Sequence, residues 1–206
     1  RSILPDGVGT PHLQASYIPG PRPRPRHVVI VSPHYAEPWG PYTPEVDGCG
    51  GSEEAVVYLS AELAKRGCDV EVFTAIPPGL QPVHVHDGVT WRGFDRAHPG
   101  IPADHLIAVR APWFVALPTA RREKRHVWIW HHDHAYPEQS WGPYVAKLAG
   151  HLYVSQWQRR TLEATTGPTR GAVIYNGVPT AQIEAARLAV AAAGRARDPF
   201  RGAWAS

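Results

Sequence analysis

The chain contains 206 residues, enough for one or two domains of the usual size of about 100 to 200 residues each. With 43% hydrophobic and 19% charged residues it has the composition of a globular protein, which excludes an intrinsically disordered chain. The net charge is +3, and no apolar run reaches the roughly 18 residues that a membrane-spanning helix needs.

Much of the basic charge lies in two segments, residues 21–26 and 121–125. Such runs usually form a solvated face, and the alternatives are attraction to an anionic membrane surface or to a polyanionic substrate. No recognition helix or base-stacking motif accompanies the charge, so we predict no nucleic-acid partner. Residues 1–26 are also rich in proline and lack an apolar segment followed by a cleavage site, so we expect a disordered lead-in there.

Residues 27–32 form a continuous β-branched run between two prolines, which predicts a strand buried on both faces. The loop that follows, residues 33–51, is long and rich in Pro, Gly and aromatic residues, and a loop of this kind is usually functional. From Ser52 an amphipathic helix is expected, with basic residues in its last turn and Gly67 as its end. Residues 69–74 alternate as a second strand and complete a βαβ unit.

The rest of the chain continues the alternation of strands and helices. Strands are predicted at residues 89–92, 106–109, 127–130, 152–155 and 172–175. Helices are predicted near residues 112–120, 142–149 and 156–166, the last with Ser155 as its N-cap and Gly167 after its end. The fold class is therefore α/β, a Rossmann-like parallel sheet with helices on both faces over residues 27–180, and ligands are expected at the carboxyl ends of its strands.

A turn with the sequence Gly50, Gly51, Ser52, Glu53 lies where the long loop meets the first helix. Two glycines let the backbone approach a ligand closely, and the helix amino terminus favours an anion. This pattern predicts contact with a phosphate or a sugar. The alternative is a tight turn without a function.

A cluster of three histidines and one carboxylate, residues 131–134, directly follows a predicted strand. One reading is a metal site completed by His84, His86 and Asp87, although no known zinc spacing is present. A second is a polar loop with ordinary histidines. The third is a substrate-facing group in which a histidine acts as hydrogen-bond partner or base and Asp133 orients it.

The order of these pieces resembles the amino-terminal half of glycosyltransferases of the GT-B fold, family 4. The resemblance covers residues 27–180 and rests on the Gly-Gly-Ser-Glu turn, residues 62–70, residues 104–110, residues 130–133, residues 153–159 and the turn 176–178. It implies transfer of a sugar from a nucleotide diphosphate sugar, with retention of the anomeric configuration and without an essential metal ion or other cofactor. The amino-terminal domain of the family binds a sugar, glycan or lipid-linked acceptor, and the carboxyl-terminal domain binds most of the donor.

The resemblance also implies roles for individual residues. Gly50 and Gly51 would approach the donor phosphate or sugar, and His132 would contact the transferred sugar, with Asp133 and Arg110 beside it. The doubled histidine leaves open whether His131 or His132 takes this position. Asn176 would lie at an inter-domain hinge. Among the aromatic residues, which stack on pyranose rings but more often fill cores, Trp39 and Tyr42 are the best candidates for acceptor contact.

After residue 178 the chain departs from the family pattern. A helix is expected over residues 181–193, and residues 203–206 look like the first strand of a second domain that is cut short. We therefore expect this chain to be inactive without a donor-binding domain. Two other functions remain open, a metal-dependent hydrolase built on the histidines and a non-catalytic carbohydrate-binding or partner-binding module. The oligomeric state is also open.

The two cysteines, Cys49 and Cys68, have neither a zinc-binding spacing nor the number needed for a disulfide framework. Reduced thiols favour a cytoplasmic location. Lipid-linked acceptors and the basic segments add a second possibility, a cytoplasmic protein in peripheral contact with the inner face of the membrane.

Overall fold

The computed structural model describes residues 24–33, 37–46, 48–81, 83–116, 126–132, 148, 150–177 and 180–192. Most of the predicted lead-in, most of the expected helix at 142–149, Asp133, and residues 193–206 lie outside the described residues.

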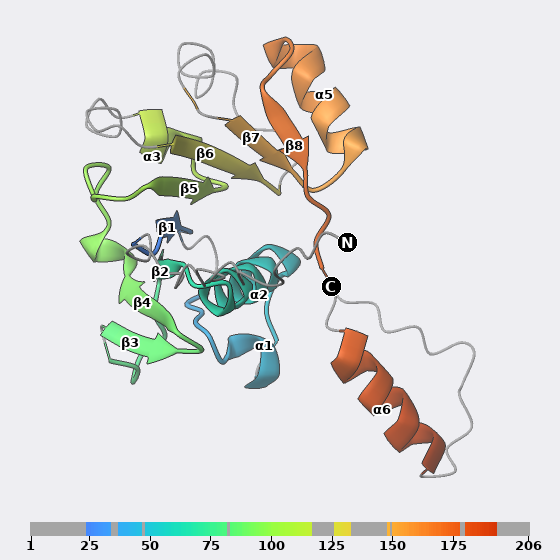
Figure 1. The fold of residues 1–206 in the computed structure, drawn as a ribbon. Coiled ribbons are helices and arrows are strands. Elements are labelled where there is room, and N and C mark those ends of the chain that lie inside the picture. Colours follow the sequence, from blue (N-terminus) through green and yellow to red (C-terminus); the bar gives the residue numbers. More distant parts are fainter. Residues whose placement is uncertain are drawn as a thin grey trace, which may run out of the picture.

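A single mixed sheet forms the centre of the structure (Figure 1). Its strands follow the order β3-β4-β2-β1-β5-β6-β7-β8, and every neighbouring pair is parallel except β3 and β4. The strands are β1 (His27–Val31), β2 (Asp69–Thr74), β3 (Val83–His86), β4 (Val89–Gly93), β5 (His105–Val109), β6 (His126–His131), β7 (Gly150–Tyr153) and β8 (Gly171–Val173). The α/β, Rossmann-like fold class is thereby confirmed.

The helices are α1 (Thr43–Val46), α2 (Gly51–Lys65), α3 (Pro112–Ala116), α5 (Gln156–Thr166) and α6 (Thr180–Ala192), with a 3-10 turn at Phe94–Arg96. The bounds of α2, α5 and α6 agree closely with the predicted ones. The predicted cap of α5 is present, because the Ser155 hydroxyl accepts a hydrogen bond of 3.0 Å from the backbone N–H of Gln158. Helix α2 begins at Gly51, one residue earlier than predicted, with Gly50 as its N-cap.

The sheet is covered by apolar residues on both faces. Successive side chains of a strand point to opposite faces, so β1 contributes Val28 and Ile30 to a core beneath α2 and contributes Val29 and Val31 to the opposite core. Helix α2 adds Val56 to the first core, and α3 adds Phe114 and Val115 to the second. Helices therefore pack on both faces, as predicted.

The antiparallel strand β3 was not predicted. It forms a hairpin with β4 through Asp87 and Gly88, whose φ angles are 49° and 75°. Asp-Gly with two positive φ angles is the sequence signature of a tight hairpin turn. The Asp-Gly pair is the local signal from which this hairpin could have been predicted.

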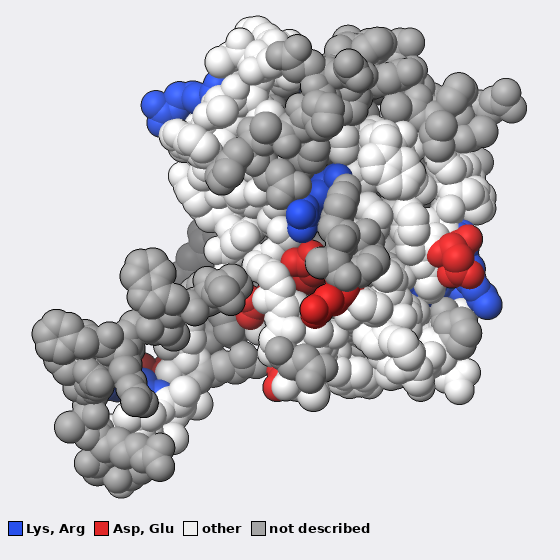
Figure 2. Space-filling model, turned by 180° about the vertical axis from the view of Figure 1, so that it is seen from behind, with Lys and Arg blue, Asp and Glu red and all other residues white. Residues whose placement is uncertain are grey.

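Helix α6 stands away from the sheet (Figure 1), and its side chains Ile183, Leu188 and Val190 are exposed. Within the residues that the structure describes, no helix combines the length and the apolar character needed to cross a bilayer. Among the residues that the structure describes, the lysine and arginine side chains on the back of the molecule are scattered, and acidic side chains lie beside basic ones near the centre (Figure 2).

Candidate functional site

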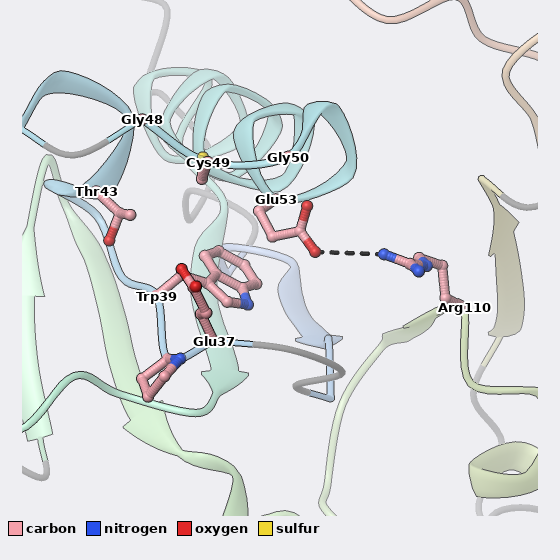
Figure 3. Close-up of a pocket in the computed structure, with 9 residues that line it drawn as sticks. Glu37, Trp39, Thr43, Gly48, Cys49, Gly50, Glu53 and Arg110 are labelled. Carbon is pink, nitrogen blue, oxygen red and sulfur yellow. Dashed lines mark hydrogen bonds and ion pairs between the residues drawn. The ribbon is translucent and has the colours of Figure 1, made fainter. Parts of the chain in front are cut away.

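A cavity of about 290 Å³ opens at the carboxyl ends of the central strands. From β1 the chain first extends the sheet on one side with β2, β3 and β4, and then returns to the other side of β1 with β5. The strand order therefore reverses between β1 and β5. Such a reversal is the usual ligand crevice of an open parallel sheet. The cavity is lined by Glu37, Pro38, Trp39, Thr43, Gly48, Cys49, Gly50, Glu53 and Arg110 (Figure 3).

An ion pair joins two of the predicted site residues across this cavity. Nη1 of Arg110, at the end of β5, lies 3.3 Å from Oε1 of Glu53 in the first turn of α2 (Figure 3), and the two side chains are 22% and 21% exposed. The backbone of Arg110 has a φ of 55°, a left-handed conformation that costs free energy for a residue with a Cβ. Strained residues of this kind cluster at ligand sites, which supports a functional interpretation of Arg110.

The amino terminus of α2 is open toward the cavity. Gly50 is the N-cap in an extended conformation, with φ −64° and ψ 152°, and no side chain caps the helix there. A Cβ added at Gly51 would meet no atom within 4 Å, so packing among the described residues gives no reason for glycine at this position. A Cβ at Gly50 would instead collide with the carboxylate of Glu53, which folds back over the N-cap. That carboxylate is placed to interact with the positive end of the helix dipole.

The surroundings of the Cys49 thiol in the cavity change its pKa. Burial, and then the charges of Glu53 and Glu54, raise the pKa of Cys49 to about 11. A helix amino terminus alone would lower a thiol pKa, so the carboxylates and burial outweigh the dipole here. The cavity can accept hydrogen bonds from hydroxyl groups through Glu37 and Glu53 and can donate them through Arg110.

The two aromatic candidates have different environments. Trp39 is only 3% exposed and lines the cavity wall, with its ring packed edge-on to Trp91 at 6.0 Å. Tyr42 does not line the cavity. Its hydroxyl lies 3.0 Å from Nε2 of His84, and its ring lies 4.4 Å from that of His86, both on the edge strand β3.

The paired histidines point to opposite faces of the sheet. His131 is the last residue of β6, not a loop residue, and it is fully buried with Nε2 3.0 Å from Nδ1 of His151 and its ring stacked on Tyr153 at 4.9 Å. Burial, and then the neighbouring His151 and His132, hold the pKa of His131 well below its usual value, so it is uncharged at neutral pH. His132 follows the strand on the α2 side, and its ring lies 4.6 Å from Trp130.

The structure separates the residues that a combined metal site would need. His84 and His86 lie on β3 and His131 on β6, five strand spacings or about 24 Å apart. Among the described residues, no group of three or more His, Cys, Asp or Glu side chains is arranged to hold a metal ion.

Asn176 lines another cavity of about 200 Å³, together with Tyr175, Trp130 and one side of α2, and this cavity shares no lining residue with the first. Of the predicted residues, Gly50, Glu53, Arg110 and Trp39 thus lie together, Gly51 and Ser52 continue the same helix turn, and Tyr42, His131 and Asn176 lie elsewhere. Five lining residues were not predicted, Glu37, Pro38, Thr43, Gly48 and Cys49. The length of their loop was the only available signal.

The chain matches no protein-family model. No curated protein is similar to it in sequence.

Proposed function

We propose that this chain is the acceptor-side domain of a retaining glycosyltransferase of the GT-B fold, similar to family 4. The observation that supports the proposal most is the cavity at the reversal point of the strand order, where the glycine turn before α2 faces Arg110 across β1 and β5. A sugar offers many hydroxyl groups, and Glu37, Glu53 and Arg110 provide acceptors and donors for them. A buried indole in the wall adds apolar surface for the ring.

In this proposal the enzyme acts by positioning and electrostatics. The backbone N–H groups of Gly51 and Ser52 would approach the donor, Arg110 would offset charge that develops on the departing diphosphate, and the acceptor would lie in the cavity. His132 is the better candidate for contact with the transferred sugar, because the His131 ring is engaged by His151 in the core. Asp133 stays a proposed partner of His132, and Asn176 a proposed hinge residue.

A second domain would bring the nucleotide sugar, and closure of the two domains would exclude water. No metal ion or cofactor is required in this scheme. The acceptor would be a sugar, a glycan or a lipid-linked sugar, and we place the reaction in the cytoplasm, with peripheral contact to the inner face of the membrane if the acceptor is lipid-linked.

The test uses the natural full-length protein and a panel of nucleotide diphosphate sugars, with release of nucleoside diphosphate and sugar transfer as readouts. Replacement of Arg110 or His132 by Ala should reduce transfer about 100-fold or more, the scale of losing one stabilising group in the transition state, whereas His84→Ala on the distant edge strand should leave it unchanged. Transfer that is insensitive to both site substitutions would refute the assignment. Chelator-sensitive hydrolysis would favour the metal-dependent hydrolase instead.

One observation favours a second function. The carboxylate of Glu53 lies over Gly50, where a phosphate would approach the helix terminus, and this arrangement suits a module that binds sugar without transferring it. Calorimetric binding of an oligosaccharide by a full-length protein that releases no nucleoside diphosphate would support the binding module.

A further inference from the structure

An apolar groove lies on the α2 side of the sheet, apart from the cavity described above. Helix α2 covers β1, β2 and β4, and beside it the described residues leave a groove of about 300 Å³ over β1, β5 and β6. Its apolar lining includes Val28, Ile107 and Trp128 from the strands, Leu59 and Leu63 from α2, and Ile174 after β8. The inner face of a parallel sheet is normally covered, so this surface is suited to an apolar occupant.

The indole of Trp128 forms part of the groove because its neighbouring strand leaves space for it. At Gly150, the register partner of Trp128 on β7, an added Cβ would lie 2.6 Å from Cζ3 of the indole. Any side chain at position 150 would therefore displace the ring.

The groove becomes basic at the amino edge of the sheet. Arg26 and His105 line both the groove and an adjoining cavity of about 390 Å³, which Arg24, Asp104 and His126 complete. Asp104 is already engaged, since Oδ1 lies 2.6 Å from Nη2 of Arg24 and Oδ2 accepts a hydrogen bond of 2.9 Å from the backbone N–H of His27. Within the described residues, the exposed guanidinium of Arg26 has no carboxylate partner, and it faces the cavity as a free cation.

The contact with Trp128 fixes which nitrogen of His105 carries hydrogen. The indole N–H can only donate, and it lies 3.3 Å from Nδ1 of His105, so neutral His105 carries its hydrogen on Nε2. Burial, and then the neighbouring His126 and Arg26, lower the pKa of His105 and keep the ring neutral. The ring of His126 stacks on that of His105 at 5.2 Å. Arg26, His105 and His126 are thus three side chains that can donate hydrogen bonds at one end of an apolar groove.

We propose that the groove and its basic end bind a single-chain alkyl phosphate, with the hydrocarbon chain along Ile107 and Trp128 and the phosphate against Arg26, His105 and His126. The three terminal phosphate oxygens are strong acceptors for these side chains, and a guanidinium can bind two such oxygens in a bidentate manner. The proposal is independent of glycosyl transfer, because this site lies at the amino edge of the sheet and the candidate sugar cavity lies at the carboxyl edge.

The test is titration calorimetry of the whole chain with dodecyl phosphate below its micelle concentration. Inorganic phosphate and dodecanol serve as probes of head and tail alone, and each should bind at least about tenfold more weakly than dodecyl phosphate. Arg26→Gln should weaken binding of dodecyl phosphate about tenfold or more, because the loss of a charge-assisted hydrogen bond is an effect of that size. The side chain is exposed, so this variant should fold normally.

A second variant addresses the groove. Ile174 is 40% exposed, so Ile174→Asp should leave the fold intact while placing a carboxylate beside the hydrocarbon chain, and binding should again fall about tenfold or more. Arg96→Gln removes an exposed arginine of the 3-10 turn that follows β4 and is the matched control, with unchanged affinity expected. Equal binding of dodecanol and dodecyl phosphate, equal binding of inorganic phosphate, or unchanged affinity in Arg26→Gln would each overturn the proposal, as would the absence of saturable binding.

Discussion

Arg110 and Glu53 are separated by 57 residues in the chain, yet they form an ion pair of 3.3 Å across the candidate sugar cavity. The pair joins the end of β5 to the first turn of α2, the two elements that flank the reversal of the strand order. The two side chains are largely buried, and ion pairs contribute about 0 to 1 kcal/mol when they are exposed but cost more to break when they are buried.

The left-handed backbone of Arg110 leads to a stability prediction. Arg110→Ala and Arg110→Gly both remove the ion pair, but only glycine adopts a φ of 55° without a Cβ clash. The glycine variant should be more stable than the alanine variant by about 1 kcal/mol in urea unfolding. An alanine variant as stable as the glycine variant would show that the backbone at this position is unstrained.

The reactivity of Cys49 should report its burial and the carboxylates beside it. Because burial, and then Glu53 and Glu54, raise its pKa to about 11, the thiol is almost entirely protonated at pH 8, and alkylation should keep accelerating up to about pH 11. The measurement is the rate of iodoacetamide modification in a Cys68→Ser background, which leaves a single thiol. Glu53→Gln should shift the profile to lower pH, and a wild-type rate that levels off near pH 9 would contradict the raised pKa.

Stability should fall on mild acidification because of His131. Its pKa in the folded state is lowered, so the unfolded chain binds more protons than the native state once the pH drops below the unfolded value of about 6.5. The stability that the neutral His131 ring contributes is therefore fully present above that pH. Below it, the free energy of unfolding should decrease by up to about 1.4 kcal/mol per pH unit because of this group.

Denaturant unfolding between pH 7.5 and 5 measures this dependence. His131→Leu should flatten it, at some cost in stability at neutral pH through loss of the bond to His151. His98→Gln, which removes an exposed histidine, is the control and should keep the wild-type slope. An identical slope in His131→Leu would place the acid sensitivity elsewhere.

Gly171, at the start of β8, should resist substitution, whereas Gly177 should not. A Cβ at Gly171 would lie 2.5 Å from the backbone oxygen of His151 and 2.9 Å from Cε2 of Tyr153, so the backbone would have to shift. Gly171→Ala should destabilise the protein by about 1 to 3 kcal/mol, the usual cost of overpacking. Gly177→Ala meets no atom within 4 Å and should cost little, as thermal unfolding can show. Equal melting temperatures would mean that β7 and β8 separate easily.

Local signals predicted the regular elements well. Ser155 and Gly167 fixed the ends of α5, because a cap and a positive φ act within one helical turn. The hairpin at Asp87 and Gly88 has an equally local signal in its Asp-Gly pair. In both places the information lay within a few residues.

The candidate site depends on contacts that no local pattern contains. The pairing of Glu53 with Arg110 follows from the order of strands, and the contact of Tyr42 with His84 follows from an unpredicted strand. His131 and His132 point to opposite faces of the sheet because side chains alternate along a strand. The sequence alone predicts this difference once β6 is taken to include His131. Loop residues such as Glu37 and Cys49 gave no periodic signal at all.

The backbone N–H of Arg110 donates a hydrogen bond of 3.1 Å to the carbonyl of Trp130, two residues before His132. The attachment points of Arg110 and His132 are therefore held by one continuous ladder between β5 and β6. For a ligand that reaches both side chains, the distance between their backbones is fixed. Adjustment of the site to ligands of different size would then come from the loop residues that line the cavity on the other side. Selectivity for ligand length would then be set by that loop, and changes of loop sequence would alter it without disturbing the ladder.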